Sequence, residues 1–139
     1  PGYLRAHGVP LTLQDLAQHR LVHYATTLGA PAGGFEHMDG AQDRSLPMAG
    51  AVTVSSAEAY TAACLAGLGL IQVPLLGVQE LLAQGRLVRV LDAWPARPMP
   101  LTLLYAHRRN LSKRVRVVMD WLASVLAEHL AQQAPPPVD

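Results

Sequence analysis

Hydrophobic and polar positions change period several times between Val52 and Leu91, the central part of the chain. The short β-branched run Val52 to Val54 predicts a strand. Small and apolar residues follow it as far as Ala66 and predict a helix. The next apolar run, Leu70 to Val73, is bounded by glycine and proline and predicts a buried strand.

The same alternation continues after this second strand. Pro74 suits the first turn of another helix, which is expected to run to about Gln84 and to end at Gly85. Arg86 to Leu91 combines two arginines with apolar residues and predicts a half-buried strand. The order strand, helix, strand, helix, strand predicts an α/β fold with a parallel sheet and right-handed crossovers.

Capping chemistry fixes the ends of the first of these helices. Ser55 and Glu58 have the spacing of a capping box, in which the serine hydroxyl takes a free amide and the glutamate reaches back. Gly67 can supply a left-handed C-terminal cap. We therefore expect Ser55 to cap a helix that runs from Ala57 to Ala66 and ends before Gly67.

The N-terminal part is predicted to hold two short helices and a strand. Gly2 to His7 suggests a helical turn ended by Gly8. Thr12 can cap a second short helix, and Asp15 lies where a negative charge favours the helix start. His19 to Tyr24 then predicts a strand.

A loop and a hairpin are expected next. Thr26 to Gly34 has turn chemistry throughout and predicts a loop. Phe35 to Met38 and Arg44 to Met48 could pair around Asp39-Gly40, since Asp-Gly favours the turn geometry that hairpins need.

The C-terminal part begins with a proline-rich linker, Asp92 to Pro100. Leu101 to Tyr105 predicts a strand, and Ser112 is expected to start a long helix with one apolar stripe. The stripe consists of Leu111, Val115, Val118, Met119, Leu122, Val125, Leu126 and Leu130. The proline-rich tail after it is expected to be disordered.

Composition limits the class of protein. The 139 residues fit one domain, or one lobe plus part of another, and 50% of them are hydrophobic. A formal net charge of +1 argues against a nucleic-acid-binding module. No apolar run is long enough to span a membrane and no signal sequence starts the chain. The single Cys64 excludes an internal disulfide.

The order and spacing of these pieces resemble LysR-type transcriptional regulators, in the C-terminal half of their effector-binding domain. The matching pieces are Val54 to Ala59, Leu65 to Leu70, Val73-Pro74 and Gly85 to Val88, flanked by Gly2 to Gly8, Thr12 to Leu16, His19-Arg20, Leu101 to Tyr105, Arg108-Arg109, Leu111-Ser112 and Val115 to Leu122.

This resemblance implies an α/β fold: a three-layer lobe with a parallel or mixed sheet, of the type 2 periplasmic-binding-protein fold, with the second lobe incomplete. It assigns residues 1–98 to the second lobe, 99–133 to the return strand and last helix of the first lobe, and 134–139 to a disordered tail.

The resemblance also implies a function. The chain would be the effector-sensing part of a cytoplasmic regulator that self-associates as a homodimer or tetramer. It would contact DNA only through a missing N-terminal helix-turn-helix, would contact no membrane, and would need no cofactor. A solute-binding protein of the same fold is the first alternative. An enzyme is the second, and the lack of a catalytic motif counts against it.

The family binds a small effector in the cleft between two lobes. Ligands of open α/β sheets bind at the carboxyl ends of the strands, which here selects Thr26, Thr27, Ser55 and Ser56. Free amides at the helix start after Val54 would suit a carboxylate or another anion. The alternative is that Ser55 is only a helix cap.

Two other clusters have simpler explanations. His19 and His23 have the spacing of a helical metal pair, but they fall in a predicted strand and no third ligand follows, so we expect no metal site. A basic cluster surrounds the start of the last helix. It could contact phosphate or an acidic partner surface, but we interpret it as a solvated face. Its members are His107, Arg108, Arg109, Lys113, Arg114 and Arg116.

The apolar stripe of the last helix is expected to be buried against another surface. In the whole domain it should lie on the sheet of the first lobe, most of which this chain lacks. An exposed patch of that size usually finds a partner. The helix could fold back over the second lobe or pack against a second copy. We predict the second copy, with Asp92 to Pro100 as the hinge of a domain exchange.

Overall fold

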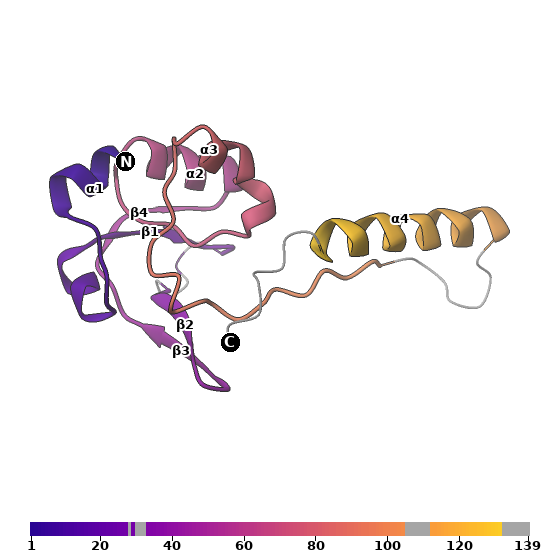
Figure 1. Cartoon of the computed structure of the whole chain (residues 1–139), viewed down its shortest axis with the longest axis horizontal. Coiled ribbons are helices and arrows are strands. Elements are labelled where there is room, and N and C mark those ends of the chain that lie inside the picture. The colour runs from indigo at the N-terminus through magenta and orange to yellow at the C-terminus, as the bar shows by residue number, and fades with distance from the viewer. Residues whose placement is uncertain (28, 30–32, 105–111, 132–139) are drawn as a thin grey trace. The chain divides into compact units, whose positions relative to one another are not determined.

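The computed structural model describes residues 1–27, 29, 33–104 and 112–131. The chain divides into two compact units, Pro1–Met99 and Pro100–Asp139. The first holds all of the β-structure assigned in the described residues, and the second holds one long helix (Figure 1). Each unit is considered by itself below.

A parallel pair of strands forms the centre of the first unit. β1 (Leu21–Tyr24) pairs with β4 (Gly50–Val54), and the last residues of the two strands, Tyr24 and Val54, lie opposite each other (Figure 1). The prediction of a parallel sheet in an α/β fold is thus confirmed. The predicted strand from His19 is shorter than expected, since β1 begins at Leu21.

The strand predicted at Leu70 to Val73 is reduced to one parallel bridge, between Leu70 and Leu21. Both backbone groups of Leu70 are bonded to the β1 side: its amide donates to the Arg20 carbonyl and its carbonyl accepts from the Val22 amide, each at 2.9 Å. Two residues later, the amide of Gln72 donates to the Tyr60 hydroxyl at 3.1 Å. A side chain has therefore replaced the neighbouring strand as partner, and the ladder stops.

The predicted hairpin is confirmed. β2 (Phe35–Asp39) and β3 (Gln42–Leu46) are antiparallel, and Asp39 pairs with Gln42 across the turn. Gly40 has φ 59°, the left-handed conformation that the Asp-Gly signal predicts. The second strand starts earlier than expected, at Gln42, and ends before Pro47, which cannot donate to a ladder.

Two α-helices of this unit, α1 and α2, end as predicted, beside glycines with positive φ. α1 (Gly2–His7) is followed by Gly8 with φ 83°, and α2 (Ala57–Leu65) is followed by Gly67 with φ 80°. α2 begins at Ala57 as predicted, but the predicted N-cap, Ser55, is wrong by one residue. The N-cap is Ser56, whose Oγ accepts from the Ala59 amide at 3.2 Å. Since β4 extends to Val54, Ser55 serves as the connection.

The second short helix is a 3₁₀ helix, η1 (Gln14–Gln18), and Thr12 does not cap it with its side chain. The bond runs the other way. Asp15 Oδ2 accepts from the amides of Leu11 and Thr12, at 2.9 and 2.8 Å. These two amide hydrogen bonds stabilise the carboxylate and lower the pKa of Asp15.

The helix predicted from Pro74 to Gln84 is divided into η2 (Leu75–Gly77) and α3 (Gln79–Ala83). The strand predicted at Arg86 to Leu91 is wrong: none forms there. The amides of residues 86 and 87 both donate to the Leu81 carbonyl, at 2.9 and 3.1 Å, and so close the end of α3. Leu91 has φ 59°, which no regular strand contains.

The core of the first unit covers both faces of β1, because its consecutive residues Leu21, Val22 and His23 are all buried. Leu16, Val22 and Pro10 are fully buried, with Leu16 at 1% and Val22 at 0% exposure. One cluster of buried residues joins α1, η1, β1, β2 and the chain after α3. It consists of Tyr3, Leu16, Leu21, Phe35, Leu70 and Leu91. Tyr60 of α2 is also buried and contacts Tyr24 of β1 edge-on.

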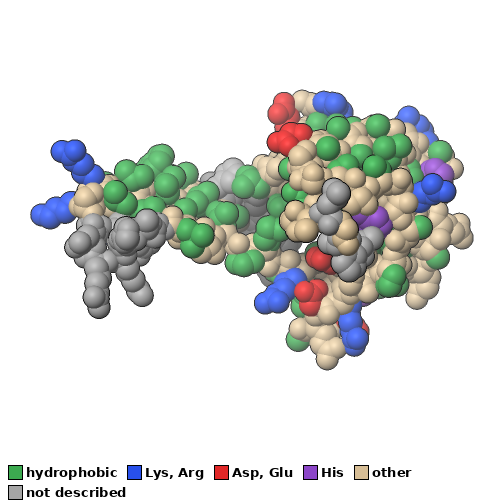
Figure 2. Space-filling model, turned by 180° about the vertical axis from the view of Figure 1, so that it is seen from behind, with side chains coloured by type: hydrophobic (Ala, Val, Ile, Leu, Met, Phe, Trp, Pro, Cys, Tyr) green, Lys and Arg blue, Asp and Glu red, His purple; other side chains and the backbone are tan. Residues whose placement is uncertain are grey.

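The second unit is dominated by α4 (Lys113–Ala131). Ser112 begins it as predicted, since its Oγ accepts from the Val115 amide at 3.3 Å. Residues 101–104 form no strand, and Tyr105 lies outside the described residues, as do the predicted tail 134–139 and residues 107–109 of the basic cluster. Apolar side chains gather along α4 in Figure 2, and Trp121 is 61% exposed.

Candidate functional site

The four residues predicted to contact a ligand follow two neighbouring strand ends. β1 and β4 are parallel and in register at their last residues. The Ala25 amide donates to the Val54 carbonyl at 2.9 Å, so the ladder continues one bond past Tyr24. Thr26 and Thr27 leave this edge on one chain segment, and Ser55 and Ser56 leave it on the other. All four side chains are exposed.

The start of α2 gives this edge an electrostatic character. The first amides of a helix have no partner within the helix and carry the positive end of its dipole. Ser56 Oγ satisfies one of them, the amide of Ala59. Glu58 stands in the first turn and already places one negative charge there. The remaining amides suit one small anion with its own hydrogen-bond acceptors.

An aromatic pair lies behind the same edge. Tyr24, the last residue of β1, has its ring 5.5 Å from that of Tyr60 on α2, in an edge-on arrangement. Tyr60 is buried, and this burial raises the pKa of its phenol, although the bond from the Gln72 amide opposes the shift. Tyr24 is 47% exposed, so the edge offers an aromatic surface beside the helix start.

Gln72 ties the hairpin to this part of the fold, and the sequence analysis did not identify it. Its Oε1 accepts from the Glu36 amide at 2.7 Å, and its Nε2 donates to the Glu36 carbonyl at 2.8 Å. The side chain thus pairs with β2 as a neighbouring strand would. One signal was available: Gln72 is the polar residue in the apolar run Leu70 to Val73.

Tyr3 plays a similar role on α1 and was also missed. Its hydroxyl accepts from the Arg20 amide at 2.9 Å and lies 3.3 Å from His19 Nδ1. His19 is 5% exposed, and burial lowers its pKa; His7 adds to the shift, and Asp15 opposes it. When His19 is neutral, its Nδ1 can accept a hydrogen bond from the Tyr3 hydroxyl. The Tyr3 hydroxyl, His19 Nδ1 and the Arg20 amide then all have hydrogen-bond partners.

His19 and His23, which have the spacing of a helical metal pair, are both buried within the fold. His19 contacts Tyr3, whereas His23 is 5% exposed and lies against Gly50. A Cβ at Gly50 would come within 2.0 Å of the His23 ring. Among the described residues, no three histidine, cysteine, aspartate or glutamate side chains group as metal ligands.

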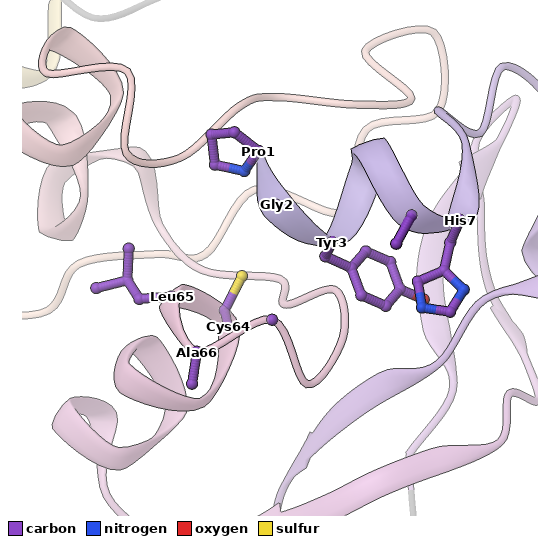
Figure 3. Close-up of a pocket in the computed structure, with 9 residues that line it drawn as sticks. Pro1, Gly2, Tyr3, His7, Cys64, Leu65 and Ala66 are labelled. Atoms are coloured by element: carbon purple, nitrogen blue, oxygen red, sulfur yellow. The ribbon is translucent and has the colours of Figure 1, made fainter.

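A cavity of about 270 Å³ lies between α1 and the end of α2 (Figure 3). Its lining includes Tyr3, His7 and Cys64, and none of the four predicted site residues. Burial raises the pKa of the Cys64 thiol, which favours the protonated thiol over the nucleophilic thiolate. A second cavity, of about 260 Å³, is lined by residues 9–11 and 89–94. Within the described ranges, no helix has the length and apolarity needed to cross a bilayer.

Comparison with known proteins places the chain in a family. The model of the LysR substrate binding domain matches residues 1–127. The uncharacterized HTH-type transcriptional regulator YhjC of Escherichia coli K12 is 43% identical over 130 residues, which cover 94% of this chain and 44% of that protein. The HTH-type transcriptional regulator CrgA of Neisseria meningitidis is 27% identical over 131 residues, which cover 94% of this chain and 43% of that protein. The chain thus spans less than half the length of either relative.

Solved structures agree with the sequence relatives. The regulatory domain of CrgA, a LysR-type transcriptional regulator from Neisseria meningitidis, aligns with a TM-score of 0.73 and 28% identity, over 91% of this chain and 61% of that one. The regulatory domain of AphB from Vibrio vulnificus gives 0.70 and 26%, over 90% and 61%. These relatives are regulators and not enzymes. The fold is the periplasmic-binding-protein-like fold of LysR regulatory domains, and the chain belongs to the LysR substrate binding domain family.

Proposed function

We propose that this chain is the effector-sensing part of a cytoplasmic LysR-type regulator, and that its ligand is a small anion. The observation that carries the proposal is the meeting of two strand ends and one helix start at a single exposed edge. Family membership supports the sensing role, and the free amides of α2 support the negative charge of the ligand.

The assignment of lobes follows from the same resemblance. Residues 1–98 form the second lobe, and residues 99–133 contribute the return strand and last helix of the first. The effector binds between the lobes, with Thr26, Thr27, Ser55 and Ser56 on the second-lobe side. The rest of the site belongs to a part of the domain that lies outside this chain.

Regulation is then a shift in population. An effector that binds one arrangement of the lobes more tightly than another moves the equilibrium toward that arrangement. The coupling changes the grip of a homodimer or tetramer on DNA, which is contacted by an N-terminal helix-turn-helix of the longer protein. The edge itself needs only to discriminate between the two arrangements by its contacts with the ligand.

Substitutions at Ser56 separate the cap from the ligand contact. Asn and Asp cap helices as well as Ser does, so both variants should keep the stability of α2. Ser56→Asp places a carboxylate at the proposed anion position, whereas Ser56→Asn stays neutral. Benzoate is the probe, because Tyr24 and Tyr60 adjoin the edge, and benzamide is its neutral match. Binding to the 139-residue chain is followed by NMR.

The amides of the four site residues should shift saturably with benzoate and not with benzamide. Ser56→Asn should retain binding, and Ser56→Asp should weaken it by about tenfold or more, as expected for a like charge at close range. Equal shifts with benzamide, or no saturable shift up to about 100 mM, would contradict an anion site at this edge.

A further inference from the structure

A chain of hydrogen bonds leads from the start of α2 to the segment that follows α3. It begins at Tyr60, whose amide donates to the Ser56 carbonyl at 3.0 Å and so bonds this tyrosine to the cap residue of α2. The Tyr60 hydroxyl accepts from the Gln72 amide at 3.1 Å. The Tyr60 ring is buried, and close packing leaves a buried ring little freedom. A shift of the helix start therefore moves the hydroxyl that holds Gln72.

The Gln72 side chain extends this connection to the hairpin. Its Oε1 and Nε2 bond to the amide and the carbonyl of Glu36, at 2.7 and 2.8 Å. These two backbone groups lie on the edge of β2 that does not pair with β3. Glu36 is exposed, so water can replace both bonds at little cost. The pairing is therefore suited to form and to break.

The same edge of β2 reaches the chain after α3. The Met38 amide donates to the Pro95 carbonyl at 2.9 Å. Amides two residues apart on a strand face the same edge, so the Glu36 and Met38 amides point the same way. Pro95 lies in the proline-rich segment 92–100, which continues along the chain into the second unit. The edge that Gln72 holds is thus also the edge that holds this segment.

We propose that Gln72 is a positioning residue that couples the anion site at the start of α2 to the segment around Pro95. The inference rests on the proposed function, because the coupling starts from an anion bound beside Ser56. The anion fixes the first turn of α2 and Tyr60 with it, Tyr60 holds Gln72, and Gln72 holds the β2 edge that carries Met38. Coupling between two sites is reciprocal, so loss of the Gln72 bonds should weaken anion binding.

Gln72→Met tests the coupling, because methionine has a similar length but bonds neither backbone group of Glu36. Gln84→Met is the matched control. It removes an exposed glutamine whose Nε2 donates only to the nearby Glu80 Oε1, at 2.9 Å. Benzoate is again the probe, and its binding to the 139-residue chain is followed by NMR. The remote signals are the Met38 amide and the indole N–H of Trp94, the neighbour of Pro95.

In the unchanged chain, benzoate should shift the two remote signals with the same midpoint as the amides of Thr26, Thr27, Ser55 and Ser56. Gln72→Met should keep the shifts at these four amides, abolish the remote ones and weaken benzoate binding by about three- to tenfold. Gln84→Met should change none of these results.

Tyr60→Phe breaks the chain of bonds at another point, because it keeps the ring against Tyr24 but removes the acceptor of the Gln72 amide. It should abolish the same remote shifts. The double variant Tyr60→Phe with Gln72→Met should bind benzoate no more weakly than the weaker single variant, since residues in one network are not additive. Additive losses are what two unrelated structural defects would give, and they would overturn the coupling.

The signals also separate failure of the coupling from failure of the proposed function. Shifts at the four edge amides without remote shifts in the unchanged chain would refute the coupling alone, whereas no shift at the edge would refute both. Amide hydrogen exchange adds a measurement without ligand. Gln72→Met should speed exchange of the Met38 amide by about threefold or more, because the edge of β2 opens more often. An unchanged rate would show that Met38 is held independently of Gln72.

Discussion

The unit of residues 1–99 and helix α4 bury apolar side chains to very different extents. Leu16, on the short helix η1, is 1% exposed because it packs in a cluster drawn from several elements. Val118, on a helix with a cleaner amphipathic pattern, is 52% exposed. The comparison shows that helical periodicity defines a face, whereas burial depends on what the rest of the chain brings against it.

Hydrogen bonds differ between the two regions in the same sense. In residues 1–99, side chains bind backbone groups far along the chain, as Tyr3 does with Arg20 and Gln72 does with Glu36. In α4 the described side-chain bonds are local, such as that from Ser124 Oγ to the Asp120 carbonyl at 3.0 Å. The first region is fixed by tertiary contacts, and α4 is fixed by its own sequence.

The largest expected effect comes from matched leucine truncations. Leu16→Ala should lower the free energy of unfolding by about 2–5 kcal/mol, since it opens a cavity in the core. Leu122→Ala should cost the first unit less than about 0.5 kcal/mol, since it lies outside that core. Urea unfolding measured through Trp94, in a Trp121→Phe background and at low protein concentration, compares them. Equal losses would abolish the contrast between the regions.

Two glycine substitutions sharpen the comparison within residues 1–99. A Cβ at Gly69 would lie 2.6 Å from the Arg20 carbonyl oxygen, beside the bridge to β1. Gly69→Ala should therefore cost about 1–3 kcal/mol of stability, since backbone has to move. Gly33 has open space around its Cβ position. Gly33→Ala should be close to neutral in the same urea assay, and a neutral Gly69→Ala would contradict the close packing.

The smallest expected effect is at the Tyr3 hydroxyl. Tyr3→Phe removes the acceptor for the Arg20 amide and the donor to His19, and should cost about 1 kcal/mol at pH 8. The equivalent test of α4, Ser124→Ala, should change the stability of the first unit very little.

The stability cost of Tyr3→Phe should be smaller at acidic pH, because His19 becomes protonated there. Its pKa is lower in the folded chain than in the unfolded one, chiefly through burial, so the unfolded chain binds the proton more tightly. The stability is complete above the ordinary histidine pKa and falls as pH drops through and below it. Protonated His19 can no longer accept from Tyr3, so the cost of Tyr3→Phe should shrink between pH 8 and pH 5. A cost that is constant with pH would show that the 3.3 Å contact is not a hydrogen bond.

The sequence by itself determined the features that depend on neighbours in the chain. Asp39-Gly40 specified the hairpin, Gly8 and Gly67 ended their helices, and Ser112 began α4. Each depends on local dihedral preferences or on a bond within one turn. The family resemblance came from the same local pieces in their order. The sequence also predicted that the four candidate site residues lie at a common sheet edge, because parallel strands end on the same side.

Tertiary structure decided what depends on partners far along the chain. The run Leu70 to Val73 has the pattern of a strand, but the Tyr60 hydroxyl took the Gln72 amide and ended the ladder after one bridge. Arg86 to Leu91 mixes polar and apolar residues and was predicted to be a strand, yet its first amides close α3. Such a pattern describes only which side of a strand would be apolar. A strand also needs a neighbour with free amides and carbonyls, and only the folded chain determines whether such a neighbour is within reach.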